Sequence, residues 1–496
     1  MPSKKESMKV KSQDTAIFFI IATAVFFTPL IYFKNVNELF EFPKMMFSYF
    51  AFSTAGMVFV VKRLLHPKDT NLKIEEELKP ITAKKSLLEK AVYLLLLANF
   101  ISAVFSILPY TSVFGYYTRF NGGLASIVLW TLLFTVLIKI KYENLFLKLG
   151  NVLIFSTIPV SVYAVLQRLG IEKNVWIEDS QTRVFSSLGQ PNWLAAFLVM
   201  LIPLVLFRAM EESNQKKKVL LSALAILNFS ALWFTYSFSG FLGILGAVLL
   251  FFIFINKESI LKNKIQLISI TGITFLVMVT NPGVFGPKLK DSINDVQNKL
   301  FPKKTYETYV AVTENAGEAQ KLTPAKEPQS NNTGNSEVSE SKDEDSEANP
   351  STNPKIEKPK FGDTTGIRLT VWRGSLNLAT SSIKNLLIGS GPETFPYAFL
   401  KFRPKEMNLT TEWDFVFNKP HNYYIEILCN LGLVGLFTYL FLIKGIFVNF
   451  KNQRSLPLKA GILGLFITDA FGWHTVMTSM LLYIFLALIQ KEDYEN

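Results

Sequence analysis

Apolar segments long enough to cross a membrane recur from one end of this 496-residue chain to the other, separated mainly by short polar connections. An α-helix rises 1.5 Å per residue, so about 20 apolar residues span a hydrocarbon core of about 30 Å. The pattern predicts an all-α polytopic integral membrane protein with about 12 transmembrane helices. The expected spans are residues 15–33, 44–64, 87–107, 122–140, 147–168, 192–209, 217–236, 240–256, 265–282, 425–448, 457–472 and 475–490.

Two features of the first nine spans follow from short local signals. The uncharged run from Val219 to Asn256 is far longer than one crossing, and Ser237-Phe238-Ser239-Gly240 is expected to break it into a helical hairpin. Residues 15–33 lack the small-residue cleavage site of a signal peptide, so this segment is expected to stay as a membrane anchor.

A long polar segment, residues 283–424, precedes the last three expected spans. From Val310 to Lys360 it holds no aromatic residue, and Pro, Ser, Asn, Glu and Lys dominate. Such a composition buries too little apolar surface to offset the conformational entropy lost on folding. Residues 302–360 are therefore predicted to form a disordered insertion.

The remainder of the polar segment has the pattern of ordered structure. Apolar side chains recur at helical spacing over residues 368–387, which predicts an amphipathic helix. Gly389-Ser390-Gly391-Pro392 ends that helix, and residues 395–402 are expected to form a second short helix near the membrane surface. The expected parts are an N-terminal transmembrane bundle at 1–282, an extracytoplasmic loop at 283–424 with an ordered active-site part at 361–424, and C-terminal transmembrane helices at 425–496.

Composition narrows the class of protein. Hydrophobic residues make up 49% of the chain and Phe alone contributes 44, which excludes a water-soluble globule. The single cysteine, Cys429, lies in an apolar stretch, so disulfides and cysteine-based metal sites are excluded. Three histidines and few intramembrane charges also argue against a dedicated metal centre, and no cofactor is expected.

The net charge of +12 reflects topology and does not indicate a nucleic-acid partner. Basic residues gather in alternate connections, which are expected to face the cytoplasm by the positive-inside rule. With about 12 spans, both termini are cytoplasmic and residues 283–424 lie outside. The clusters are Lys4, Lys5, Lys9 and Lys11; Lys62, Arg63 and Lys68; Lys139, Lys141 and Lys148; Lys216, Lys217 and Lys218; Lys257, Lys262 and Lys264; and Lys451, Arg454 and Lys459.

The segment Lys419-Pro420-His421-Asn422-Tyr423-Tyr424 places a titratable imidazole where the polar loop enters an apolar helix. An enzyme acting on a membrane-anchored substrate needs such a group, because histidine moves protons near neutral pH. The alternative is a histidine at a helix start that only bonds nearby backbone. Asn422 is expected either to cap the following helix or to orient His421, and Glu426 is a carboxylate one turn further on.

Four separated motifs together resemble the O-antigen ligase and polymerase superfamily. The resemblance extends over roughly residues 15–490, less the insertion, and one position departs from it. Members often carry an arginine in a Thr-x-Ser-Arg motif, whereas this chain has Phe238 there. The motifs are Phe114–Gly123; Arg183–Asn192; Arg368–Trp372 followed by Ile388–Phe395; and Pro420–Glu426 followed by Gly432 and Gly435.

The superfamily consists of polytopic glycosyltransferases that move a glycan from an undecaprenyl diphosphate carrier, and this implies roles for the motif residues. Guanidinium groups suit the diphosphate because their planar fork donates paired hydrogen bonds. Arg368, Arg183 and Arg119 are therefore the expected diphosphate-binding residues, although each can instead pair with lipid headgroups or loop groups. His421 and Arg368 are the expected catalytic residues. Asn422, Asn192, Trp372, Gly391 and Glu426 are expected to support them.

The function that the resemblance implies is an inverting, metal-independent glycosyltransferase of the bacterial cytoplasmic (inner) membrane, with its active site outside. Its partners would be an undecaprenyl diphosphate-linked glycan donor, a lipid, glycan or protein acceptor, and membrane lipids. Ligation is favoured over polymerisation by the Arg119 and Arg183 motifs. A polysaccharide flippase is a further alternative, but it should place charges at mid-bilayer and show repeated halves. A non-catalytic scaffold would leave Arg368 and His421 far apart.

Cysteine labelling tests the predicted topology. In intact cells, a His421→Cys protein should react with a membrane-impermeant maleimide, because position 421 is expected on the outer face. A Lys217→Cys control should react only after the membrane is permeabilised. Labelling of position 421 only from the cytoplasm would contradict the topology and remove the site from its substrate.

Overall fold

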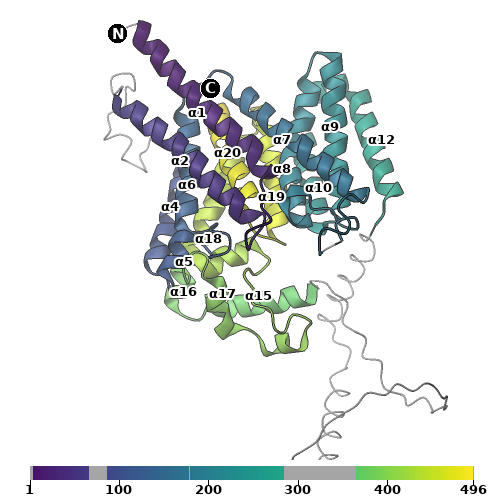
Figure 1. The fold of residues 1–496 in the computed structure, drawn as a ribbon. Coiled ribbons are helices and arrows are strands. Elements are labelled where there is room, and N and C mark those ends of the chain that lie inside the picture. Colours follow the sequence, from purple (N-terminus) through teal and green to yellow (C-terminus); the bar gives the residue numbers. More distant parts are fainter. Residues whose placement is uncertain (1–3, 66–85, 178, 284–364, 495–496) are drawn as a thin grey trace, which may run out of the picture. The chain divides into compact units, whose positions relative to one another are not determined.

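The computed structural model describes residues 4–65, 86–177, 179–283 and 365–494. Within these ranges, every regular element is a helix (Figure 1). Contacts define one compact unit from residues 1–290 and 367–496 and a second from residues 291–366. The predicted insertion at 302–360 lies outside the described residues, and the following description concerns the first unit.

Twelve of the described helices overlap the twelve expected spans, so the all-helical prediction is confirmed for these ranges. Seven segments are both long and apolar enough to cross a membrane, which supports a multi-pass protein, while the total of 12 stays a prediction. These seven are Gln13–Leu30, Glu41–Leu65, Leu87–Val104, Leu145–Arg168, Pro191–Glu211, Gln215–Phe234 and Tyr423–Phe447. The twelve helices are α1 (Lys4–Phe27), α2 (Glu41–Leu65), α4 (Leu87–Val104), α6 (Leu124–Lys139), α7 (Leu145–Arg168), α8 (Pro191–Glu211), α9 (Gln215–Phe234), α10 (Phe238–Phe254), α12 (Lys264–Thr280), α18 (Tyr423–Phe447), α19 (Leu456–Asp469) and α20 (Val476–Tyr494).

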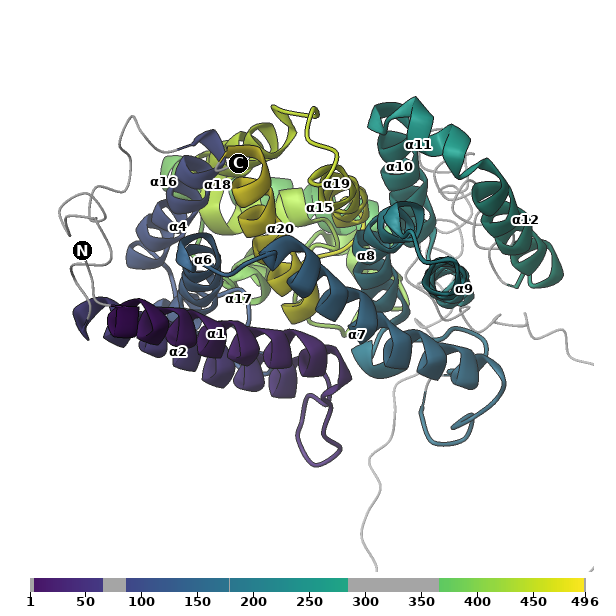
Figure 2. The ribbon, with the colours of Figure 1, turned by 90° about the horizontal axis from the view of Figure 1, so that it is seen from above.

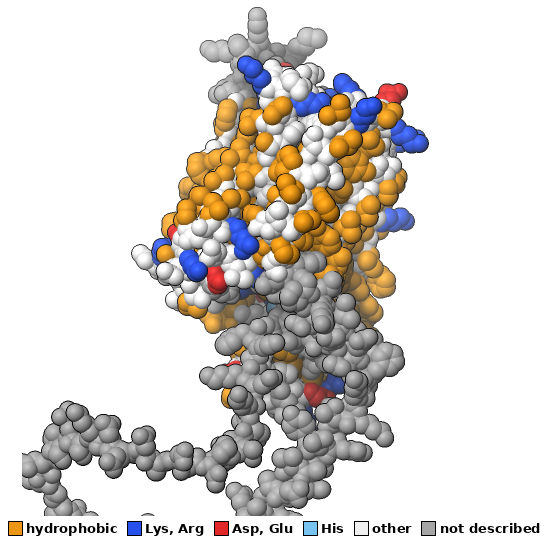
Figure 3. All heavy atoms as spheres, turned by 90° about the vertical axis from the view of Figure 1, so that its right-hand side faces the viewer, with side chains coloured by type: hydrophobic (Ala, Val, Ile, Leu, Met, Phe, Trp, Pro, Cys, Tyr) orange, Lys and Arg blue, Asp and Glu red, His pale blue; other side chains and the backbone are white. Residues whose placement is uncertain are grey.

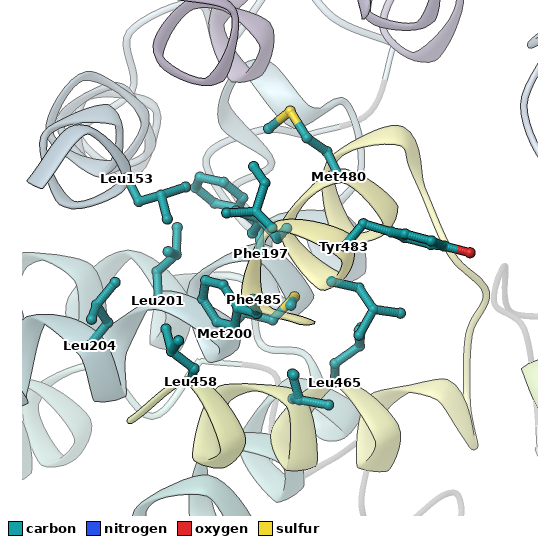
Figure 4. Packing of buried hydrophobic residues seen from close by; sticks show 14 of the residues in the cluster. Leu153, Phe197, Met200, Leu201, Leu204, Leu458, Leu465, Met480, Tyr483 and Phe485 are labelled. Carbon is teal, nitrogen blue, oxygen red and sulfur yellow. The ribbon is translucent and has the colours of Figure 1, made fainter. Parts of the chain in front are cut away.

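Helix α8 forms the centre of the bundle and is apolar on every side, as expected of a helix surrounded by others. In Figure 2 it lies among α7, α9, α10, α19 and α20, and each of these helices contacts it. Figure 4 shows its side chains Phe197, Met200 and Leu201 packed against α19 and α20, next to Leu465 and Phe485. This packing holds the α19–α20 pair against the centre of the bundle.

The outer side of the bundle is apolar where lipid would cover it. Figure 3 shows a broad hydrophobic surface with lysine and arginine side chains gathered toward one end. On α12 the side chains of Ile265, Ile268 and Phe275 are exposed, and only Ile270 of that helix is buried. Exposed apolar faces of this extent suit a bilayer and would be unfavourable in water.

The segment before α18 folds into short helices at one end of the bundle: α15 (Thr365–Ala379), α16 (Ile383–Ile388) and α17 (Phe395–Phe399) (Figure 1). The prediction of a single amphipathic helix over residues 368–387 is wrong in one respect. It is divided into α15 and α16, because the Ser382 side chain accepts the Asn385 N–H and so caps a new helix. The second predicted helix, 395–402, corresponds to α17 and a 3₁₀ turn at Leu400–Phe402.

The loop between α16 and α17 packs against a kink in α18. Gly432 interrupts the helix with a φ of 66°. The Ser390 N–H donates to the Cys429 carbonyl at 2.9 Å, and the Gly391 N–H donates to the Asn430 carbonyl at 3.0 Å. A Cβ at position 432 would lie 2.4 Å from the Leu387 carbonyl carbon, so the two backbones touch where only glycine fits.

Replacing the kink glycine should destabilise the fold. Gly432→Ala places a methyl group against rigid backbone at a positive φ, and we expect a loss of about 2 kcal/mol or more in unfolding free energy. Gly272→Ala on α12 is the matched control, because a Cβ there meets nothing within 4 Å. Thermal unfolding of the two purified variants in detergent measures the difference. Equal midpoints would contradict the close packing.

Candidate functional site

The turn at residues 470–475, between α19 and α20, is where four of the nine predicted site residues meet. The Ala470 carbonyl accepts a hydrogen bond from Asn422 Nδ2 at 3.1 Å. The Phe471 carbonyl accepts one from Arg368 Nη1 at 3.4 Å. The ring of Trp473 lies edge-on to the His421 ring, with 5.0 Å between centroids. His421, Asn422 and Arg368 are thus brought together by a turn that no sequence motif singled out.

Arg119 reaches the same turn from the loop between α5 (Pro109–Phe114) and α6. Its guanidinium carbon lies 5.4 Å from the Trp193 ring centroid and 5.9 Å from the Trp473 ring centroid. These are cation–π distances, which position the charge without neutralising it. Trp193 follows Asn192 in the first turn of α8, so the Arg183–Asn192 motif ends at this group of side chains.

The backbone at His421 is held from two sides. Trp372 Nε1 donates to the Pro420 carbonyl at 2.9 Å, which connects α15 to the residue before the histidine. The Asn422 side chain accepts the Ile425 N–H at 3.1 Å and so caps α18. His421 itself has a φ of 56°, an uncommon conformation for a residue other than glycine. Trp372 and Asn422 thus hold the backbone on either side of His421, and Trp473 contacts its ring.

Arg183 lies at the turn between α9 and α10. Its Nε donates to the Thr235 carbonyl at 3.0 Å. Phe238, where members of the superfamily often carry arginine, begins α10 after this turn, and its ring lies 6.0 Å from that of Phe471. A further guanidinium, that of Arg168, lies 5.6 Å from the Tyr236 ring at the same turn. Sequence reasoning did not select Arg168, which ends an apolar helix.

Gly391 has a structural role in the described loop. Its N–H and that of Ser390 donate to α18, and the Gly389 N–H donates to the Asn385 carbonyl at 3.0 Å. These three amides are thus engaged inside the protein. The expectation that these glycines end a helix agrees with this arrangement, and the Gly391 N–H could support a ligand at the site only if its bond to the Asn430 carbonyl broke.

Glu426 belongs to a buried ion triad that sequence reasoning did not assemble. Lys419 Nζ contacts Glu426 Oε1 at 2.5 Å and also contacts Glu393 Oε1. The two carboxylate side chains are 6% exposed. Burial alone would lower the pKa of Lys419, but the two carboxylates outweigh burial and raise its pKa above the ordinary value. Glu393 stands inside the Ile388–Phe395 motif and Lys419 directly precedes the Pro420–Glu426 motif, so their position in or beside the motifs was the available signal.

A second histidine lies next to this triad. His474 Nε2 is 2.9 Å from Asp469 Oδ2, and its ring stacks on Tyr423 with 3.9 Å between centroids. The Tyr439 hydroxyl also lies 3.3 Å from Asp469 Oδ2. Sequence gave no motif around His474, because its partners come from α18 and α19. Among the described residues, no group of three or more His, Cys, Asp or Glu side chains could hold a metal ion.

The fold and the site define a class, a multi-pass membrane protein with a histidine-containing polar site at one end of its helical bundle. Residues 223–440 match a family model described as O-antigen ligase. The match confirms the superfamily prediction for the part of the chain that holds Arg368, Gly391 and His421. It indicates a membrane glycan-processing function of the O-antigen ligase or polymerase type. A comparison with curated proteins gave no match.

Removing the lysine of the triad should destabilise the protein strongly. Lys419→Met leaves two buried carboxylates without their cation, and we expect a loss of about 3–5 kcal/mol in unfolding free energy. Because folding raises the pKa of Lys419, its contribution is complete at neutral pH and is lost only as pH rises through the folded-state pKa.

The control for this variant is Lys405→Met, at an exposed position of the same loop. A triple variant, Lys419→Met with Glu393→Gln and Glu426→Gln, should recover part of the loss because no buried charge remains. Thermal unfolding at pH 7 compares the three proteins. A Lys419→Met protein as stable as the Lys405→Met control would contradict the buried triad.

Proposed function

We propose that this protein is an inverting, metal-independent glycosyltransferase that moves a glycan from undecaprenyl diphosphate to an acceptor outside the cytoplasmic membrane. The observation that carries the proposal is the convergence of Arg119, Arg368 and His421 on the 470–475 turn. A scaffold would not need two guanidinium groups and an imidazole at one turn, and a flippase would need charges along a path through the bilayer. The family match supports the same class of reaction.

The diphosphate of the donor is assigned to the arginines. Arg368 and Arg119 contribute positive charge beside His421, and Arg183 contributes a third guanidinium at the α9–α10 turn. Paired N–H donors stabilise phosphate oxygens and neutralise the charge that builds up as the diphosphate leaves. Arg168, at the same turn as Phe238, supplies a guanidinium close to the position where related proteins often carry one.

His421 is assigned to the reacting end of the donor. In an inverting transfer, an acceptor hydroxyl attacks the anomeric carbon, the bond from that carbon to the diphosphate oxygen breaks, and the hydroxyl proton leaves. His421 either takes this proton or, when charged, stabilises the departing phosphate. Asn422 and Trp372 hold the backbone on either side of His421 for either role. Trp193, which follows Asn192 in α8, lies against the Arg119 guanidinium.

The proposed orientation puts both termini in the cytoplasm and the site outside. In Figure 1 the marked N- and C-terminal ends lie toward one end of the bundle, and α15, α16 and α17 lie at the other. The lysines of the connections Gln215–Lys218 and Lys257–Lys264 belong to the end away from α15. Such separation is what the positive-inside rule requires of this topology.

Purified protein given lipid-linked glycan and acceptor should release undecaprenyl diphosphate, and His421→Ala should lower the rate at least about 100-fold. Arg368→Ala should lower it about 10- to 1000-fold, because charge on the leaving group is no longer stabilised. Arg373→Ala is the control on the same helix, since that side chain is 60% exposed and pairs with Glu406. Chelation of divalent metals should leave the rate unchanged. An unchanged rate in His421→Ala would exclude the mechanism.

Ligation and polymerisation differ in what accumulates when the protein is absent. Ligation is favoured here because Arg119 and Arg183, the residues of the ligase-like motifs, lie at or next to the site. Cells lacking a ligase should accumulate full-length lipid-linked chains, whereas cells lacking a polymerase should accumulate single repeat units.

A further inference from the structure

A cavity with several polar groups in a largely apolar wall is lined by close neighbours of His421 and has no role in the function proposed above. Its volume is about 60 Å³. Lys419 and Tyr423, two residues on either side of His421, both line it. His474, which follows the Trp473 ring that contacts His421, lines it as well. The cavity wall therefore comes within two residues of His421 on each side along the chain, and it is formed largely by α4, α6, α18 and α20.

Two buried oxygen atoms, on two of the residues that line the cavity, accept no hydrogen bond from the described residues. They are Glu426 Oε2 and Asn430 Oδ1, and their side chains belong to residues that are 4% and 5% exposed. Buried polar atoms are normally hydrogen-bonded, and leaving one without a partner is costly. Both atoms are acceptors, so the missing partner carries hydrogen-bond donors.

The charge of the cavity excludes an anion as that partner. Lys419 supplies one positive charge, whereas Glu393 and Glu426 supply two negative charges, and both bonds of the lysine go to Oε1 atoms. Glu426 Oε2 thus keeps negative character inside a poorly solvated space. A diphosphate would be repelled here, while neutral hydroxyl groups would be attracted.

The rest of the lining suits a neutral ring with hydroxyl groups. Asn99 and Asn121 add amide groups, and Ser479 adds a hydroxyl. Tyr423 and Tyr439 add aromatic rings with polar tips. A few placed polar groups among aromatic side chains are typical of small-molecule sites, and this set matches the hydroxyls and C–H faces of a sugar.

We propose that this cavity is a sugar subsite that binds one ring during the transfer. Glu426 Oε2 and Asn430 Oδ1 accept hydrogen bonds from its hydroxyl groups, and the tyrosine rings pack on its faces. The assignment rests on the proposed function and deepens it, because it divides the site into an arginine side for diphosphate and an acidic side for sugar. The ring belongs either to the acceptor or to the donor glycan.

Kinetics of Glu426→Gln and Asn430→Leu distinguish the two sources. Each variant removes one hydrogen-bond acceptor and keeps the approximate size of the side chain. If the ring is the acceptor's, the KM for acceptor should rise about 10-fold or more, with the KM for donor unchanged. If it is the donor's, the KM for donor should rise by a similar factor with the KM for acceptor unchanged. Unchanged KM values for both substrates in both variants would overturn the proposal.

The matched control is Cys429→Ala, next to Asn430 on α18. Its thiol lies 3.3 Å from the Ser375 carbonyl, and Cys429 is not part of the cavity wall. This variant should keep wild-type KM values for donor and acceptor. Thermal unfolding of all three variants shows whether each is folded. If Glu426→Gln disturbs the ion triad, Asn430→Leu still tests the subsite, because Asn430 is not part of that triad.

A binding measurement separates this proposal from the proposed function. Saturation-transfer NMR on the full chain in detergent uses the methyl glycosides of glucose, galactose and N-acetylglucosamine as probes. Signal from at least one glycoside, lost in Glu426→Gln and kept in Cys429→Ala, supports the subsite even where no transfer from undecaprenyl diphosphate is detected. No signal from any glycoside with the wild-type chain would mean that the cavity holds only water and would overturn it.

Discussion

The break in α18 at Gly432 is the constraint on which the site depends. A break in a helix inside the bilayer exposes carbonyl groups that water cannot reach, so protein groups must satisfy them. Here the amides of Ser390 and Gly391 bond to the carbonyls of Cys429 and Asn430. These bonds connect the loop between α16 and α17 to the transmembrane bundle. The same loop carries Glu393. Its carboxylate forms an ion pair with Lys419, which precedes His421 by two residues.

Charge is sorted around the proposed reacting histidine. Guanidinium groups meet at the 470–475 turn, and the Glu393–Lys419–Glu426 triad, whose lysine precedes His421 by two residues, has an excess of negative charge. A transferase of this kind binds two chemically different groups. One is the negatively charged diphosphate that leaves, and the other is a neutral sugar that carries hydroxyl groups. Arginine suits the leaving diphosphate, and carboxylates suit hydroxyl groups. The arrangement thus provides two neighbouring electrostatic environments within one site.

Much of the fold followed from hydrophobic patterning, because a membrane allows few alternatives to a helix. The expected spans coincide with helices of the described ranges, including the hairpin break near Ser237. The predicted helix at 368–387 was too long, since three consecutive hydroxyl residues, Thr380 to Ser382, end one helix and cap the next. The number of spans is harder to predict from the sequence. Helices α19 and α20 are buried among other helices, so their lengths depend on packing as well as on bilayer thickness.

The sequence by itself determined the class of fold, the place of His421 at the start of an apolar helix and the supply of arginines in the connecting loops. These are local properties, set by hydrophobic periodicity and by residue type. Only the tertiary structure decided which side chains meet. The 470–475 turn carries no motif, and the triad joins residues 26 and 7 positions apart through the α18 kink. Such contacts depend on how helices distant in sequence pack, which no local pattern specifies.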